Sequence, residues 1–209
     1  LDLKGMNRIL EVNEADQYIL IEPGVTSGDV RKHLDERHPG LRIGYSFAPP
    51  TTSVMANALM DGLTSLGQRE GPTGDWINGV EAVLPDGELV RTGLGQIGPW
   101  CSSSPLPRLE QLFVNTHGTT GVVTKMALQV FPQRRWRRRL FVLAHDVDRA
   151  YALVKRVARD EICDDVGALG WPLAKLLFGD TNPTWRDPAE PLLFLFFEVT
   201  SNYKKEFQV

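Results

Sequence analysis

The first 132 residues alternate between short apolar stretches, turn-forming residues and helix-like segments. Residues 18–25, YILIEPGV, form an apolar run closed by Pro-Gly, which is typical of a buried strand. The next segment, 26–38, begins with Thr26 or Ser27 as a helix cap and then carries apolar residues at helical spacing. The pattern therefore predicts a strand followed by a turn and a helix.

A second helix and a hairpin are predicted further along. Residues 51–62, TTSVMANALMDG, read as a short helix that is capped by Thr52 or Ser53 and ended by a glycine. The stretches VEAVLP (80–85) and ELVRTG (88–93) alternate apolar residues on either side of Asp-Gly, which predicts a hairpin with a two-residue turn.

The pattern changes after residue 132. Residues 109–114 predict a helical turn, and 118–132 predict a glycine-bounded loop that leads into a long strand. The basic run QRRWRRR (133–139) is interpreted as a linker between a domain at 1–132 and a second domain at 140–209. In the second domain we expect strands near 140–144, 166–171 and 192–199, helices at 147–159 and 172–179, and a Pro-rich loop before the last strand. This order suits half of a ferredoxin-like layer of helices on an antiparallel sheet, so the predicted class is α+β.

Composition narrows the choice of function. With 209 residues, 42% of them hydrophobic and 23% charged, the chain can form one large core or two modest ones. The net charge of −3 is too balanced for a nucleic-acid-binding surface, and the basic run alone does not change this expectation. Cys101 and Cys163 lack the spacing of a zinc site or a disulfide framework. No apolar run approaches the roughly 20 residues of a membrane span, so we expect a cytoplasmic protein with no metal and no membrane contact.

Three segments carry a resemblance to a known family. They are MNRILEV with YILIEPGVTSGDVRKHL, then GPTGDWINGVEAVLPDGELVRTG (71–93), then LFVNTHGTTGVVTKMALQVFP (112–132). In this order and spacing they resemble the FAD-binding PCMH-type domain of the vanillyl-alcohol oxidase and p-cresol methylhydroxylase flavoprotein superfamily. Gly71 and Asp75 match the family's Tyr-Gly-x-x-x-Asp pattern, with Glu70 in place of the aromatic residue. Residues 118–124 match its Gly-Thr-Leu-Gly-Ile-Val-Thr pattern, with Thr120 for the leucine.

A flavin site needs backbone that approaches the cofactor closely, and glycines permit this approach. The helix that starts near Ser53 could also offer free N–H groups to a polar cofactor edge. The candidate cofactor-binding residues are Thr51, Thr52, Ser53, Asn57, Gly71, Asp75, Gly118, Gly121 and Val122, with Gly74 as a further close approach. Each has a structural alternative, because glycines form turns, Asp75 can cap a turn and Ser53 can serve only as a helix cap. His117 could face the cofactor or be a hydrogen-bonded structural histidine.

The resemblance implies an FAD-dependent oxidoreductase that takes a hydride from a small organic substrate. The segments SVMANALMDG and RTGLG favour a phenol or aryl alcohol as substrate, and the alternative is a 2-hydroxy acid of the D-lactate or glycolate type. A hypothesis of another class is a non-catalytic relic or interaction module that keeps the fold without cofactor. No catalytic residue is assigned. No Gly-x-Gly-x-x-Gly follows a strand, so a dinucleotide-binding Rossmann domain is not predicted.

The ends of the chain suggest a fragment. It starts on LDLKGMNRILEV without an initial Met, and SNYKKEFQV reads as the opening of a helix. The family's pyrophosphate-binding loop is expected upstream of Leu1. We therefore expect the isolated chain to be colourless and inactive, and to self-associate through a strand edge beside YILIEP.

Overall fold

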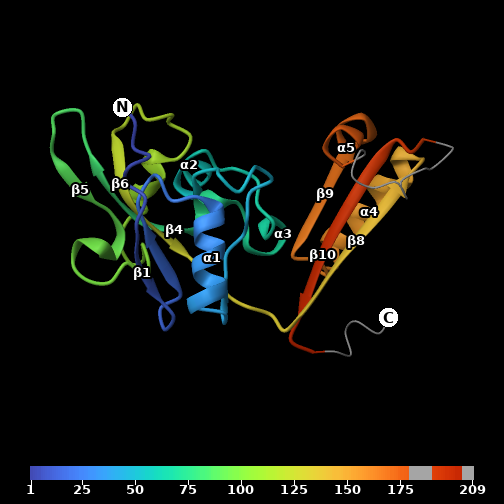
Figure 1. Cartoon of the computed structure of the whole chain (residues 1–209), viewed down its shortest axis with the longest axis horizontal. Helices are drawn as coiled ribbons and strands as arrows, with labels where there is room; N and C mark the ends of the chain where they lie inside the picture. Colours follow the sequence, from blue (N-terminus) through green and yellow to red (C-terminus); the bar gives the residue numbers. More distant parts are fainter. Residues whose placement is uncertain (179–189, 204–209) are drawn as a thin grey trace. The chain divides into compact units, whose positions relative to one another are not determined.

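Two compact units make up the chain. The computed structural model describes residues 1–178 and 190–203. The first unit contains residues 1–64 and 71–133, and the second contains 65–70 and 134–209 (Figure 1). The short segment 65–70 therefore leaves the first unit for the second and returns, which the sequence did not indicate.

A five-stranded antiparallel sheet forms the centre of the first unit. Its strand order is β1-β2-β6-β4-β5. The strands are β1 (Ile9–Asn13), β2 (Tyr18–Ile21), β4 (Ile77–Val83), β5 (Leu89–Arg91) and β6 (Val122–Gln129). A separate pair joins β3 (Leu41–Arg42) to β7 (Phe131–Pro132). The predicted α+β class with antiparallel sheets is confirmed.

The helices of the first unit start where polar caps satisfy their first N–H groups. α1 (Ser27–Arg37) is capped by Thr26, which forms a capping box with Asp29. α2 (Val54–Leu59) is capped by Ser53, whose hydroxyl accepts a hydrogen bond from the N–H of Ala56 at 3.1 Å. Three short 3₁₀ turns complete the unit: η1 (Thr73–Trp76), η2 (Gly93–Gln96) and η3 (Leu109–Phe113).

The predicted hairpin is present, but its turn is longer than predicted. The N–H of Gly87 binds the carbonyl of Leu84 at 2.9 Å, and the N–H of Leu84 binds the carbonyl of Glu88 at 2.9 Å. The loop is therefore Pro85–Gly87 and not the Asp86-Gly87 pair alone. Gly87 adopts φ +89°, the left-handed conformation that closes a three-residue hairpin loop.

Strand β2 lies at the centre of the core because both of its faces are covered. Tyr18 and Leu20 pack with Ala127 of β6 on one face. Ile19 and Ile21 point to the other face and are fully buried. A continuous apolar run of this kind is expected only for a strand that is covered on both sides.

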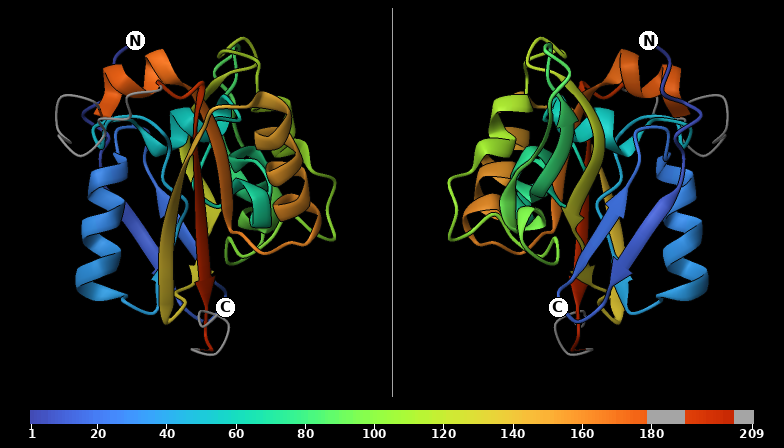
Figure 2. Two further views of the ribbon diagram at one scale, coloured as in Figure 1. Left: turned by 90° about the vertical axis from the view of Figure 1, so that its right-hand side faces the viewer. Right: turned by 90° about the vertical axis from the view of Figure 1, so that its left-hand side faces the viewer.

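The second unit is a three-stranded antiparallel sheet in the order β8-β10-β9, and its strands lie side by side in Figure 2. The strands are β8 (Trp136–Ala144), β9 (Asp165–Gly170) and β10 (Leu193–Ser201). α4 (Val147–Arg159) packs through Ala150 on Leu195 and Phe197. α5 (Trp171–Phe178) packs through Ala174 on Phe194. Because alternate residues of β10 point to opposite faces, the two helices cover the two sides of the sheet.

The segment predicted as a linker is largely strand. Residues 136–139 form the first half of β8 and pair with the end of β10. Arg137 and Arg139 share one side of the strand, and both donate to Oε2 of the buried Glu198, at 2.6 Å and 2.9 Å. The arginines that suggested an exposed linker thus compensate a buried carboxylate.

Segment 65–70 is held in the second unit by polar contacts. It contains α3 (Gly67–Glu70), and the guanidinium of Arg69 pairs with the fully buried Asp164. The same carboxylate accepts a hydrogen bond from Thr200. The predicted Pro-rich loop and the helix predicted at the C-terminal end lie largely outside the described residues. None of the described helices has the length and apolar character needed to cross a membrane.

Candidate cofactor-binding site

A pocket of about 510 Å³ opens in the first unit. Most of its wall comes from two segments that are far apart in the sequence, the α2 region at 53–60 and the loop and strand start at 116–123. The lining residues of these segments are Ser53, Met55, Ala56, Leu59, Met60, Thr116, His117, Gly118, Thr120, Gly121, Val122 and Val123. Phe113, Pro23 and the start of the chain complete it.

Four of the predicted site residues line this pocket: Ser53, Gly118, Gly121 and Val122. The hydroxyl of Ser53 is already engaged, since it donates to the carbonyl of Pro23 at 2.6 Å and caps α2. The idea that the start of α2 offers free N–H groups is wrong for two of them. The N–H of Val54 binds the carbonyl of Val25, and that of Ala56 binds Ser53.

The other candidates near α2 lie outside the pocket wall. The carbonyl of Thr52 accepts a hydrogen bond from the N–H of Ser27 at 2.9 Å, so this residue joins the starts of the two helices. Thr51 is an exposed turn residue. The amide of Asn57 contacts the hydroxyl of Thr73 at 3.3 Å, which directs it away from the lining.

Gly71, Gly74 and Asp75 also do not line the pocket. Gly71 has φ +78°, so its backbone conformation explains the glycine. Gly74 of η1 donates its N–H to Asp61, which follows α2, at 3.0 Å. The exposed carboxylate of Asp75 lies 3.6 Å from Arg108, as expected for a surface turn residue.

Gly121 is needed by the fold itself. A Cβ at this position would meet the carbonyl oxygen of Val83 at 2.8 Å and the ring of Phe113 at 3.4 Å. Substitution would therefore disturb the contact between β6 and β4 before it reached a ligand. Gly121 was expected to leave space chiefly for a cofactor. It lines the pocket, but the space beside it is limited first by the protein's own Val83 and Phe113.

The loop at 115–120 is fixed on both sides of His117. The N–H of Asn115 binds the carbonyl of Leu59 of α2 at 2.7 Å. On the other side, the N–H of Thr119 binds the carbonyl of Thr116 at 3.1 Å. Among the described residues, the backbone N–H groups of His117, Gly118 and Thr120 have no acceptor. These donors belong to residues that line the pocket, and His117 and Gly118 are exposed.

The apolar residues of the pocket wall were not predicted from the sequence. Met55, Leu59 and Phe113 line the pocket, yet in the sequence they look like ordinary core residues at helical spacing. The only available signal was their position within the segments that carry the family resemblance.

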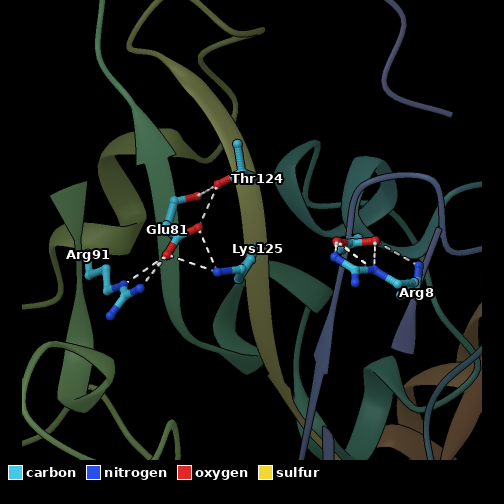
Figure 3. Close-up of polar contacts among 6 residues, drawn as sticks. Arg8, Glu81, Arg91, Thr124 and Lys125 are labelled. Carbon is cyan, nitrogen blue, oxygen red and sulfur yellow. Dashed lines mark hydrogen bonds and ion pairs between the residues drawn. The ribbon is translucent and has the colours of Figure 1, made fainter. Parts of the chain in front are cut away.

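A polar cluster centred on Glu81 stabilises the strand that forms the pocket's edge (Figure 3). The carboxylate accepts hydrogen bonds from Arg91 Nε at 2.8 Å, Lys125 Nζ at 3.1 Å and Thr124 Oγ1 at 3.1 Å. Burial acts to raise the pKa of Glu81, but these hydrogen bonds outweigh it and the pKa lies below the ordinary value. The cluster joins β4, β5 and β6, and the two residues of β6 before Thr124 line the pocket.

A second buried carboxylate lies at the end of β2. Glu22 accepts hydrogen bonds from Arg8 Nη2 at 2.7 Å and from the backbone N–H of Arg8 at 2.9 Å. The side-chain hydrogen bonds from Arg8 lower the pKa of Glu22, while burial opposes them. This pair holds the start of β1 beside Pro23, which lines the pocket.

Comparisons with known proteins point to one family. Residues 1–93 match the family described as FAD binding domain. The chain is 30% identical over 165 residues to the glycolate oxidase subunit GlcD of Bacillus subtilis (strain 168), covering 76% of this chain and 33% of that protein. It is also 30% identical over 182 residues to 1'-carboxy-chondrochloren decarboxylase of Chondromyces crocatus, covering 84% of this chain and 32% of that protein.

Among solved structures, the 4-ethylphenol oxidase from Gulosibacter chungangensis in complex with isoeugenol has the same fold. The TM-score is 0.77 at 20% sequence identity, over 97% of this chain and 42% of that chain. At this identity the likeness concerns the fold alone. The chain spans about a third of the length of the curated relatives it matches.

Proposed function

From the match of residues 1–93 to the FAD binding domain family, we propose that the chain is part of an FAD-linked oxidase and that its pocket holds part of FAD in an enzyme that oxidises a small organic substrate. One observation carries the proposal. The two segments 53–60 and 116–123, which contain candidate site residues, meet in one pocket.

The pocket's size and lining support a flavin. A volume of about 510 Å³ lies within the range of roughly 300 to 1,000 Å³ that is common for small-molecule sites. The flavin ring is flat and largely apolar with a polar edge, so it needs apolar walls and a few donors. Met55, Leu59 and Phe113 supply the walls. The backbone N–H groups of His117, Gly118 and Thr120 in the loop at 115–120 would supply the donors.

When bound, FAD supplies a ring that accepts a hydride from a substrate carbon. The residues of this chain have the tasks of binding and orientation. The apolar side chains would exclude water from one side of the ring. The loop at 115–120 would hold its N–H donors in place, because its hydrogen bonds to α2 and within itself fix its backbone.

We propose a phenol or aryl alcohol as the substrate. The segments SVMANALMDG and RTGLG support this choice. A 2-hydroxy acid is the second candidate, because the glycolate oxidase subunit is 30% identical over 165 residues. Both substrates would lose a hydride, so the flavin site fits either.

Anaerobic reduction of the flavin tests the proposal. The protein is expressed from its complete gene, purified and mixed without oxygen with 4-ethylphenol or with glycolate. We expect the flavin absorbance near 450 nm, a property of the ring itself, to bleach with the phenol and to persist with glycolate.

Bleaching by glycolate alone would favour the 2-hydroxy-acid alternative. A protein that contains no flavin, and takes up none when FAD is added, would contradict the proposal and favour a non-catalytic relic of the fold.

A further inference from the structure

His117 is the one ionisable side chain among the described residues that line the pocket. The other lining side chains of segments 53–60 and 116–123 are apolar or carry hydroxyl groups. Two of those hydroxyls, on Thr116 and Thr120, bind each other at 3.1 Å. Among the lining side chains, only that of His117 can therefore carry a charge that meets a ligand.

The backbone at His117 is held in the left-handed conformation, which few residue types other than glycine adopt and which histidine adopts more often than most. His117 has φ +52°, and Asn115 two residues earlier has φ +57°. Such left-handed residues persist where the surrounding structure fixes them, and they concentrate at ligand sites. Here the hydrogen bonds of Asn115 to α2 and of Thr119 to Thr116 supply this constraint.

The lining segments 53–60 and 116–123 contain no other titratable residue, and at the start of the chain, which also lines the pocket, Asp2 lies between Leu1 and Leu3. Just beyond them, the carboxylate of Asp61 accepts the N–H of Gly74. Lys125, two residues after the lining, is paired with Glu81. On η3, the buried Glu110 is paired with Arg108.

We propose that His117 contacts the bound flavin cofactor and that its protonated imidazole strengthens binding through the cofactor's negative charge. The inference rests on the proposed FAD site and adds a named positioning residue to it. The imidazolium can contact the charged phosphates of the cofactor or the partly negative acceptor atoms at the edge of its neutral ring. In either case the adjacent N–H groups of His117 and Gly118 present further donors to the same ligand.

Flavin titrations at two pH values test this role. The dissociation constants of FAD, FMN and riboflavin are measured at pH 5.5 and pH 8.5 by fluorescence quenching, for the protein freed of its own flavin. The variant is His117→Asn, because asparagine tolerates a left-handed backbone and cannot be protonated. His33→Asn, on α1 and outside the pocket, is the matched control.

We expect FAD to bind the unaltered protein and the control roughly three- to fivefold more tightly at pH 5.5, the size of a charge contact at a partly exposed site. The difference should vanish in His117→Asn while its thermal unfolding stays unchanged. Loss of the pH effect with all three ligands would assign the contact to the ring, and loss with FAD and FMN alone would assign it to phosphate.

An unchanged pH effect in His117→Asn would overturn the role of His117 and leave the FAD site intact. If the unaltered protein binds FAD equally at both pH values, the role of His117 is likewise overturned. Failure of the unaltered protein to bind any of the three flavins would overturn both inferences.

Discussion

At the scale of single residues, the buried carboxyl group of Asp165 lowers the free energy of unfolding when it is ionised. It is 7% exposed and lies at the start of β9. Burial raises its pKa from an ordinary 3.8 to about 6, and the nearby carboxylate of Glu198 adds to the shift. The folded chain therefore holds this proton more tightly than the unfolded chain. The contribution of Asp165 to stability falls as the pH rises from about 4 to about 6 and is constant above that range.

Asp165→Asn should remove this cost. We expect the variant to be more stable than the unaltered protein by roughly 1 to 3 kcal/mol at pH 7.5, with the gain shrinking towards pH 4. Urea unfolding of the second unit at pH 4.5, 6 and 7.5 measures the difference. Asp35→Asn, at an exposed position of α1, should give no comparable gain. A gain that does not depend on pH would contradict the titration of Asp165 as its cause.

At the scale of elements, the pairing of β8 determines which arginines of the basic run (133–139) are accessible to trypsin. Residues 137–139 are paired in register with 198–200 of β10, whereas 134 and 135 lie before the strand. Limited trypsin digestion should therefore cut after Arg134 and Arg135 well before it cuts after the arginines of β8. Mass spectrometry of the fragments identifies the sites. Early cleavage throughout 134–139 would show that the first half of β8 opens readily.

Several elements could be predicted because their signals are local. Thr26 and Ser53 were among the predicted caps, and the periodicity of 147–159 gave the bounds of α4. The hairpin turn was predicted one residue too short, because Pro85 was read as the end of the strand. The strand at 136–139 was missed because its partner, Glu198, lies about sixty positions away in the sequence.

At the scale of the whole molecule, contacts between segments that are far apart in the sequence could not be predicted. Nothing in the residues around Arg69 indicates that segment 65–70 joins the second unit through Asp164. In the candidate site, too, local motifs could be recognised in the sequence but the contacts between distant segments could not. Ser53 and Gly118 could be predicted to line the pocket from motifs, but the apolar residues opposite them resemble core until the segments are brought together.

The most direct test of the central claim fills the pocket. Ala56 lies on α2, is exposed and lines the pocket, so Ala56→Trp adds a large side chain there without replacing core. Ala152→Trp, at an exposed position of α4, is the matched control. The measurement is the FAD dissociation constant of each protein, purified from the complete gene and freed of flavin, together with its thermal unfolding. We predict that Ala56→Trp loses at least tenfold in FAD affinity, about 1.4 kcal/mol, while both variants unfold like the unaltered protein. Unchanged FAD affinity in a folded Ala56→Trp protein would contradict the assignment of this pocket to the flavin.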